Sequence, residues 1–315
     1  MSRSFSVPPK VSVNICCYNS EKFIKETLQS ILDQTFNDFE VIVIDDGSKD
    51  KTRQIIKSFS DSRIKYFYQD NQGLSISRNK AIELSKGKYI ALIDHDDCWI
   101  PDKLELQVQL LEKNAKIGLV YSDSYIVDEK LNIKNRFFID FLPYRGNIIK
   151  PLLHLNIIPC LTAVFRRELV DMIGDFDPAL AITEDYDFFI RIAFVADIDY
   201  IDKPLARCRI HSDNTTGKNL EKLYKETISI LRAYDNKTKD STIKKVITEQ
   251  LMKNYRMLVL FYLKFNRLPC INKEVMTLIN KEKNIFIRWG LFLLSFLPLM
   301  MRRNVFNILF MVKKP

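Results

Sequence analysis

The chain has 315 residues, of which 47% are hydrophobic and 28% are charged. This composition describes an ordinary folded protein with one large domain or two modest ones, and it excludes a chain that depends on staples such as disulfides. Six cysteines without a CxxC pair or zinc spacing are expected to be reduced thiols in a cytosolic compartment. Residues 1–10 contain no apolar stretch, so no secretory signal is expected.

The net charge of +9 is unevenly distributed along the chain. Residues 216–315 contain 20 Lys and Arg against 7 Asp and Glu, which leaves 28 of the 48 basic and 32 of the 39 acidic residues in the first 215 positions. The C-terminal part therefore has a net charge of +13 and the rest a net charge of −4. Such asymmetry indicates a basic region that binds an anionic partner, which could be phospholipid, nucleic acid or an acidic protein.

Strands and helices are predicted to alternate along the first half of the chain. Strands are expected over residues 11–17, 39–44, 64–68, 89–93 and 119–122. Helices are expected after two capping serines, Ser20 and Ser48, and over residues 75–85 and 101–114. This alternation is typical of βαβ units and a parallel sheet. Periodicity weakens from 124 to 160; strands then resume at 163–165 and 198–201, with helices over 167–173 and from 183 onward.

Acidic and polar residues follow each of the early predicted strands. They are Tyr18-Asn19, Asp45-Asp46, Asp70-Asn71 and the acids of Asp94-His95-Asp96-Asp97. Ligands of open α/β sheets bind outside the carboxyl ends of the strands, so these residues predict a nucleotide pocket. An Asp-x-Asp pair also offers oxygen ligands to a divalent cation, which can neutralise a diphosphate. The alternative is a solvated acidic loop that caps the next helix.

Seven short motifs follow one another in a recognisable order. They are Tyr18-Asn19, Asp45-Asp46-Gly47-Ser48, Gly73–Asn79, Gly87–Ile90, Asp94–Asp97, Gly174–Asp177 and Glu184–Asp187. Together, from residue 11 to about 211, they resemble the family-2 glycosyltransferases of the GT-A fold. The resemblance implies a Rossmann-like α/β fold with a mixed, mainly parallel sheet and helices on both faces. Glycine-rich dinucleotide and P-loop motifs are missing, which disfavours hydride transfer and P-loop phosphoryl transfer.

We expect two regions, a GT-A catalytic domain over residues 1–215 and a basic helical extension over residues 216–315. The first would divide into a nucleotide-sugar half, about 1–123, and an acceptor half, about 124–215. The bacterial surface-polysaccharide members of the family are the ones that the chain resembles.

The resemblance also implies roles for residues of the donor site. Tyr18 would lie near the nucleobase, Asp46 would accept a hydrogen bond from the uracil ring, and Arg78 would lie near the nucleotide. Asp94 would lie near the ribose or the donor sugar. The family usually has a Pro-Thr pair before the Tyr-Asn, whereas this chain has Cys16-Cys17, which removes a hydroxyl next to the base.

Metal and proton chemistry would fall to other residues of the same motifs. Asp96 would bind Mg²⁺ or Mn²⁺ bridging the diphosphate, and His211 is a candidate for a further metal or phosphate contact. His95 is expected in the pocket wall, and Asp97 as a cap of the following helix. The acceptor hydroxyl is a poor nucleophile, so an inverting transfer needs a carboxylate that takes its proton. The resemblance assigns this role to Asp185, with Glu184 as the nearest rival that spacing alone does not separate.

The last hundred residues are helical and basic in pattern. Residues 243–264 have apolar positions at helical spacing. Residues 285–301 form a mainly apolar run of 17 residues that contains Arg288 and Pro298. A spanning helix needs about 20 apolar residues, so the run falls short. We expect residues 285–314 to bind a membrane surface through an interfacial helix with basic flanks, with packing on the catalytic domain or a dimer contact as the alternative.

The sequence as a whole predicts a metal-dependent transferase that moves a hexose-type sugar from a UDP-sugar to a saccharide acceptor. The acceptor is expected on a lipid diphosphate carrier, in lipopolysaccharide or capsule synthesis, at the cytoplasmic face of the inner membrane. The alternatives are a nucleotidyltransferase acting on a sugar phosphate and a non-enzymatic basic binding protein. A nucleic acid partner is not expected, because the first 215 residues are slightly acidic.

Overall fold

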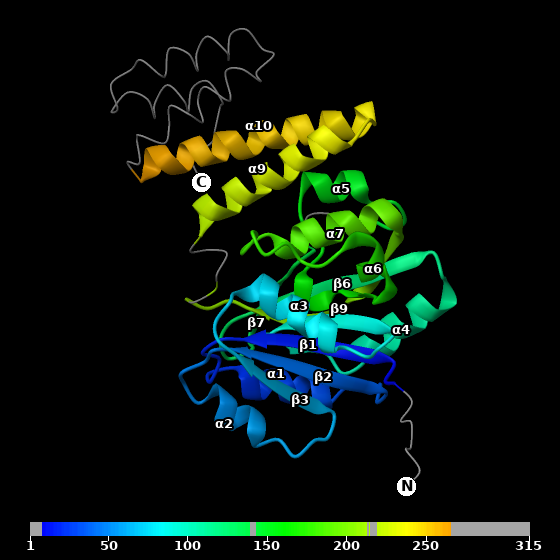
Figure 1. Cartoon of the computed structure of the whole chain (residues 1–315), viewed down its shortest axis with the longest axis vertical. Helices are drawn as coiled ribbons and strands as arrows, with labels where there is room; N and C mark the ends of the chain where they lie inside the picture. The colour runs from blue at the N-terminus through cyan, green and yellow to red at the C-terminus, as the bar shows by residue number, and fades with distance from the viewer. Residues whose placement is uncertain (1–7, 139–142, 213, 215–218, 266–315) are drawn as a thin grey trace. The chain divides into compact units, whose positions relative to one another are not determined.

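The computed structural model describes residues 8–138, 143–212, 214 and 219–265. They form two compact units, of which the first ends at Asn214. The first unit contains the sheet and helices α1 to α7, and the second contains helices α9 and α10 (Figure 1).

A nine-stranded sheet forms the centre of the first unit, in the order β3-β2-β1-β4-β8-β6-β9-β5, with β7 paired to β6. Strands β3, β2, β1 and β4 are parallel neighbours, as are β6 and β9, whereas β8, β5 and β7 run antiparallel to theirs. The mixed, mainly parallel sheet is thereby confirmed. The strands are β1 (Val11–Cys17), β2 (Phe39–Asp46), β3 (Ile64–Gln69), β4 (Tyr89–Asp94), β5 (Cys98–Trp99), β6 (Ile117–Val127), β7 (Ile133–Arg136), β8 (Val164–Arg166) and β9 (Asp197–Arg209).

Helices cover both faces of this sheet, as the fold class predicts. They are α1 (Ile24–Leu32), α2 (Thr52–Lys57), α3 (Leu74–Leu84), α4 (Lys103–Lys113), α5 (Ile149–His154), α6 (Glu168–Ile173) and α7 (Glu184–Val195), with a 3₁₀ turn η1 (Cys160–Thr162). One set of side chains from β1, β2 and β4 packs against α1 and α4, and a second set, from β1 and β2, packs against α3. Successive strand residues point to opposite faces, so strands covered on both faces read as continuous apolar runs.

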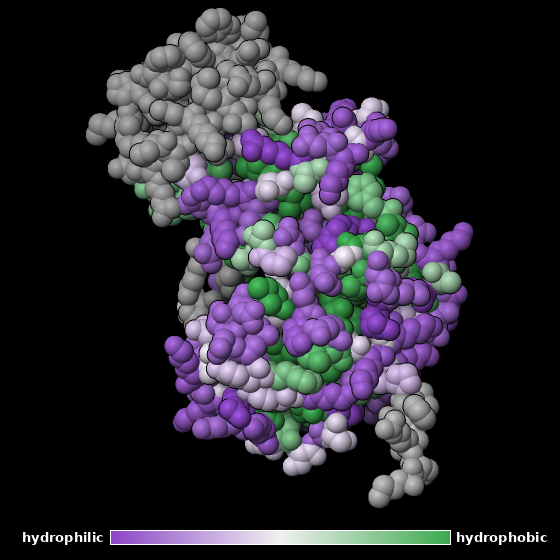
Figure 2. Space-filling model, in the orientation of Figure 1, coloured by the Kyte–Doolittle hydropathy of each residue, from purple (hydrophilic) through white to green (hydrophobic). Residues whose placement is uncertain are grey.

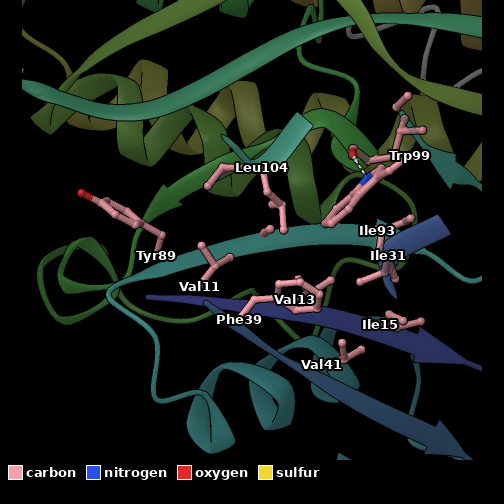
Figure 3. Close-up of a cluster of buried hydrophobic side chains, with 14 of the residues drawn as sticks. Val11, Val13, Ile15, Ile31, Phe39, Val41, Tyr89, Ile93, Trp99 and Leu104 are labelled. Atoms are coloured by element: carbon pink, nitrogen blue, oxygen red, sulfur yellow. Dashed lines mark hydrogen bonds between the residues drawn. The ribbon is translucent and has the colours of Figure 1, made fainter. Parts of the chain in front are cut away.

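The larger core cluster lies on the α1 and α4 side of the sheet (Figure 3). Val13 and Ile15 of β1 contribute to it together with Ile31 of α1 and Leu104 of α4. Trp99 is also buried there, and its indole N–H donates to the carbonyl of Leu161 at 2.8 Å. On the outer face shown in Figure 2, hydrophobic side chains appear as separate patches among hydrophilic ones.

The amino-terminal edge of the sheet is closed by buried polar contacts. Ser12 of β1 donates to Glu40 of β2 at 2.7 Å and accepts from the N–H of Gly87 at 2.8 Å. A Cβ at Gly87 would lie 2.5 Å from the Ser12 nitrogen, so only glycine allows the loop before β4 to approach β1 this closely.

Several local predictions were wrong, each because a distant segment supplies a partner. Helix α1 begins after Phe23 and α2 after Lys51, and neither has a side-chain cap. The Ser20 N–H donates to Thr52, and the Ser48 hydroxyl accepts from Asn19, so these serines join the loops instead of capping helices. Strands β6 and β9 are longer than expected because they pair with each other over most of their length.

Lys103, in the first turn of α4, is a buried lysine of the core. Its side chain is fully buried, and its Nζ has no hydrogen-bond partner among the described residues. The Nζ lies 4.1 Å from the centroid of the Trp99 ring. Burial lowers the pKa of Lys103 well below its ordinary value, because the charged form loses its hydration.

Replacing Lys103 by methionine is expected to raise the free energy of unfolding at pH 7 by about 1–3 kcal/mol, the penalty of a buried polar group without a hydrogen bond. The unfolded lysine keeps its proton up to about pH 10.4, whereas the folded one releases it earlier, so wild-type stability rises with pH across that window. The gain from Lys103→Met therefore shrinks towards pH 10. Urea unfolding at pH 7 and pH 10 measures both effects, and a variant that is less stable than wild type at pH 7 would contradict them.

The second unit contains two helices that pack against each other, α9 (Leu220–Lys237) and α10 (Ser241–Lys264) (Figure 1). The Asp240 carboxylate caps α10 by accepting from the N–H groups of Thr242 and Ile243. Helix α10 confirms the helical pattern predicted over 243–264. In the part of the chain that the structure describes, no helix has the length and hydropathy needed to cross a membrane. The membrane-surface prediction for 285–314 lies outside the described residues.

Candidate active site

The carboxyl ends of β1, β2 and β4 lie side by side at one edge of the sheet. Cys16 of β1 is paired with Ile44 of β2 on one side and with Asp94 of β4 on the other. Burial raises the pKa of the Cys16 thiol to about 12, with smaller effects from four charged groups around it, Arg78, Asp94, Asp46 and Glu184. Residues of four of the seven motifs, Asp46, Arg78, Asp94 and Glu184, therefore converge on the end of β1.

Arg78 of α3 bridges two carboxylates in this site. Its Nη1 donates to Oε1 of Glu184 at 2.5 Å, and its Nη2 donates to Oδ1 of Asp94 at 3.0 Å. Arg78 and Glu184 are both buried, whereas Asp94 exposes 38% of its side chain. The arginine thus links α3, α7 and β4, and one oxygen-bearing side chain of the bridge, Asp94, remains open to a ligand.

Asp46, at the end of β2, holds the loop that leads into α3. Its carboxylate accepts from the N–H groups of Gln72 and Gly73, both at 2.9 Å, and from the Gln69 amide at 2.8 Å. Gly73 has a φ of 94°, which only glycine adopts without strain, and precedes the first residue of α3. An ionised carboxylate has about four acceptor positions, so roughly one remains for a ligand N–H.

Tyr18 follows β1 and exposes 45% of its surface at this edge. The next residue, Asn19, has a φ of 49°, a left-handed conformation that asparagine tolerates well. Its N–H donates to the Ser48 hydroxyl at 2.9 Å, and its Oδ1 accepts from the N–H of Lys49 at 2.9 Å. The loop after β1 is therefore tied to the loop after β2, and the tyrosine ring is available for stacking.

Asp96 and His211 form the second group of the site. The Nε2 of His211 lies 2.8 Å from Oδ2 of Asp96, and both side chains are largely buried. The Asn214 amide also donates to Oδ2 of Asp96, at 3.3 Å, while its Oδ1 accepts from the N–H of His211 at 2.6 Å. Oδ1 of Asp96 has no hydrogen-bond partner among the described residues.

These two side chains could hold a divalent cation together with a bound substrate. Mg²⁺-type sites use one or two protein carboxylates plus substrate phosphates, and in this pair Asp96 is the carboxylate and His211 adds a nitrogen ligand. A full protein cage is not present in the described ranges, where no group of three His, Cys, Asp or Glu side chains could hold a metal. A cation here would therefore depend on a bound phosphate for the rest of its ligands.

Glu184 and Asp185 begin helix α7 and differ in their surroundings. Glu184 is buried against Arg78, whereas no described cation forms an ion pair with Asp185. Asp185 accepts from the Asn156 amide at 3.4 Å and from the N–H of Tyr186 at 2.6 Å. Burial and the adjacent Glu184 carboxylate raise the pKa of Asp185 to about 7, although Arg78 acts in the opposite direction.

The expected capping role of Asp97 was wrong. Helix α4 begins at Lys103 without a side-chain cap. Asp97 is buried instead, and its Oδ1 accepts from the N–H of Arg209 on β9 at 2.8 Å. A partner more than a hundred positions away gave no signal in the local sequence.

Four further residues of the site had no assigned role in the sequence analysis. They are Gln69, Asn156, Cys160 and Asn214, which contact or face the residues described above. Cys160 is buried in η1, and burial raises its pKa well above the ordinary value. None of the four lies in one of the seven motifs, and only their pairing partners, distant in sequence, bring them here.

A separate cleft of about 440 Å³ lies at the other end of the strands. Lys10, Lys86 and Arg167 line it, together with Asp38 and Glu168. It contains none of the predicted site residues, so the candidate site is the carboxyl edge of the sheet.

Comparison with known proteins identifies the family. The family model for "Glycosyl transferase family 2" matches residues 12–174. An uncharacterized glycosyltransferase of Rickettsia typhi is 34% identical over 221 residues, which is 68% of this chain and 68% of that protein. The UDP-Glc:alpha-D-GlcNAc-diphosphoundecaprenol beta-1,3-glucosyltransferase of Escherichia coli is 34% identical over 183 residues, which cover 58% of this chain and 69% of that protein.

Solved structures show the same fold. Staphylococcus aureus TarS 1–349 in complex with UDP-GlcNAc matches with a TM-score of 0.71 at 20% identity, over 96% of this chain and 89% of that one. A mannosyltransferase from Pyrobaculum calidifontis in complex with GDP-Man and Mn²⁺ matches with a TM-score of 0.60 at 17% identity, over 97% of this chain and 86% of that one. The GT-A fold predicted from the motifs is confirmed. The chain belongs to glycosyl transferase family 2 and is a glycosyltransferase that uses a nucleotide-linked sugar.

Proposed function

We propose that the chain is an inverting, metal-dependent hexosyltransferase that takes its sugar from a UDP-sugar and transfers it to a saccharide hydroxyl. The observation that carries the proposal is that the two acids at the start of α7 have different surroundings. Glu184 is committed to Arg78, while Asp185 has no ion pair among the described residues and has a pKa of about 7. A pKa near the working pH is what a general base requires.

This difference favours Asp185 over Glu184 as the base. A carboxylate paired with a buried guanidinium is stabilised in its charged form and is therefore a weak proton acceptor. Glu184 is in that position, and it is 3% exposed. Asp185 is less buried than Glu184 and has no such ion pair among the described residues. It can therefore accept a proton from the acceptor hydroxyl as that oxygen attacks the anomeric carbon.

The donor would bind over the ends of β1, β2 and β4. Tyr18 offers a ring for the base, and Asp46 has one remaining acceptor position for an imide N–H. Arg78 pairs with Asp94 at the end of β4 and would help to orient the diphosphate. Asp94, which is only partly covered, is placed for a sugar or ribose hydroxyl. The uridine assignment is supported by the Escherichia coli relative, whose name gives UDP-Glc, and by TarS 1–349, which was solved in complex with UDP-GlcNAc.

Asp96 and His211 would hold the cation, Mn²⁺ or Mg²⁺. A cation at that point supplies positive charge that offsets the charge growing on the leaving diphosphate. The role of this chain's residues is to hold the donor phosphates next to it and to keep the acceptor hydroxyl near Asp185. A structural relative binds GDP-Man together with Mn²⁺, which supports this arrangement.

The acceptor is proposed to be a saccharide on a lipid diphosphate, at the cytoplasmic face of the inner membrane. Support comes from the Escherichia coli relative, whose name gives a diphosphoundecaprenol acceptor, and from the net charge of +13 over residues 216–315. The division into a catalytic domain, 1–215, and a basic membrane-directed region, 216–315, belongs to the same proposal. Family membership favours this function over a nucleotidyltransferase or a non-enzymatic binding protein.

Nucleotide binding tests the donor site without any knowledge of the acceptor. UDP at a hundred times its dissociation constant, with Mn²⁺, is expected to raise the melting temperature by about 5–10 °C, because a ligand that binds only the folded state stabilises it. GDP and dTDP should give smaller shifts. In Asp96→Ala the increment that Mn²⁺ adds to the UDP shift should disappear. Equal shifts with all three nucleotides, or an unchanged Mn²⁺ increment in Asp96→Ala, would refute the donor and metal assignments respectively.

A further inference from the structure

The side chain of His211 lies beyond the end of β9, so something must hold it against Asp96. Strand β9 ends at Arg209, and His211 follows two positions later. Its Nε2 is nevertheless 2.8 Å from Asp96 and its side chain is only 5% exposed. The side chains of Arg209 and His211 are both buried, whereas Ile210 between them is 58% exposed, so Arg209 and His211 lie on the same side of this segment.

Phe23 lies next to both of these side chains. Its ring centroid is 4.4 Å from the guanidinium carbon of Arg209 and 4.8 Å from the centroid of the His211 ring. Phe23 is 6% exposed and is the residue that precedes the first turn of α1. The His211 ring thus packs against the ring of a residue that is far away in the sequence.

Arg209 is itself fixed from several directions. Its N–H donates to Oδ1 of Asp97 at 2.8 Å, and its Nη2 donates to Oε2 of Glu26 at 2.7 Å. Its Nη1 donates to the carbonyl of Glu129 at 3.0 Å, and the residue is 1% exposed. Asp97 is the immediate neighbour of Asp96. The hydrogen bond from Arg209 to Asp97 therefore connects the segment that contains Asp96 to the end of β9, from which the chain continues to His211.

We propose that Asp97, Arg209 and Phe23 form a positioning network that sets the spacing between Asp96 and His211 before a divalent cation binds. The inference rests on the proposed metal site and adds residues that do not touch the cation. Asp97 fixes the end of β9 relative to Asp96, Arg209 carries that constraint to Phe23, and Phe23 supports the imidazole ring. Residues outside the ligand shell that orient the ligands contribute to metal affinity, because a loosely held ligand must be ordered on binding.

The chain provides a matched control for Phe23. Phe39, at the start of β2, is 4% exposed and lies 4.4 Å from the guanidinium carbon of Arg63. Its ring has the same burial and the same kind of cationic neighbour, but it lies at the amino-terminal edge of the sheet, away from His211. A leucine at either position keeps an apolar side chain and removes the ring face.

The experiment measures Mn²⁺ binding by electron paramagnetic resonance, in the full chain, with saturating UDP. Phe23→Leu and Asp97→Ala are expected to raise the dissociation constant for Mn²⁺ by about 10-fold or more, the range found for outer partners of metal ligands. Asp97→Asn keeps an oxygen acceptor for the Arg209 N–H and should stay closer to wild type than Asp97→Ala. Phe39→Leu should stay within about twofold of wild type. In UDP release assays, Phe23→Leu should recover most of its kcat once Mn²⁺ is saturating.

The possible outcomes distinguish a failure of the positioning network from a failure of the proposed metal site. If wild type binds Mn²⁺ and Phe23→Leu binds it equally well, the positioning network is refuted and the metal site stands. The same conclusion follows if Phe39→Leu loses as much affinity as Phe23→Leu, because the effect would then be one of general stability. If wild type itself binds no Mn²⁺ in the presence of UDP, the metal site and the network both fail.

Discussion

Replacing Asp185 by asparagine is expected to lower kcat by about 10²–10⁴-fold, the usual contribution of a general base. Asparagine has nearly the same shape and keeps an oxygen for the N–H of Tyr186, so the fold and donor binding should persist. What it loses is the ability to take the proton of the acceptor hydroxyl. Steady-state release of nucleoside diphosphate, with the melting temperature as a check on folding, measures the effect.

The pH dependence gives this prediction a second test. Because the carboxylate must be deprotonated to act as a base, wild-type kcat should rise with pH through about 7 and then level off. Asp185→Asn should lose that rise together with its activity. Asp187→Asn is the matched control, because Asp187 lies in the same first turn of α7 but pairs with Arg191 at 2.9 Å. An Asp185→Asn enzyme that keeps more than a tenth of wild-type kcat would show that the base is elsewhere.

Replacing Arg78 by methionine is expected to cost about 3–5 kcal/mol in the free energy of unfolding, because Glu184 is left buried without its cation. Donor binding should weaken as well, since Arg78 holds Asp94 in the proposed donor site. Arg78→Lys should recover part of the stability only, because one ammonium does not reproduce the fork that reaches both Glu184 and Asp94. Urea unfolding of the variants provides the free energies.

A double-mutant cycle distinguishes this explanation from a simple packing loss. Removing the charge of Glu184 in the same protein, as Arg78→Met with Glu184→Gln, should restore a substantial part of the lost stability, since no unpaired charge remains in the core. If the double variant is as unstable as the sum of the two single ones, the ion pair is not the source of the effect.

The parallel half of the sheet could be predicted from the sequence because each strand carries its own signal. β1, β2 and β4 are apolar runs buried on both faces, and each ends in polar residues that mark the ligand edge. The second half carries weaker signals. β5 consists of Cys98 and Trp99 alone, and β9 contains several charged residues that are only partly buried, so both exist because of partners far along the chain.

In the candidate site too, features that depend on nearby residues could be predicted, whereas contacts between residues far apart in the sequence could not. Strand direction predicts that Asp46, Asp94 and Asp96 lie at one edge of the sheet, and the resemblance to the family adds Arg78 of α3 to them. Our proposal of Asp185 over Glu184 as the base depends on the position of Arg78, which lies on another helix more than a hundred residues earlier. The local sequence predicts that Asp97 caps the nearest helix, because nothing near it in the sequence indicates that β9 returns to it.

The most direct test of the central claim is donor hydrolysis by the full chain. UDP-, GDP- and dTDP-sugars would be supplied with Mn²⁺, and nucleoside diphosphate release would be compared between wild type and Asp185→Asn. The account predicts release from a UDP-sugar by wild type and a loss of about 10²-fold or more in the variant, since hydrolysis by water needs the same base. Release that is equal in the two proteins, or no release together with no binding of any nucleotide, would contradict it.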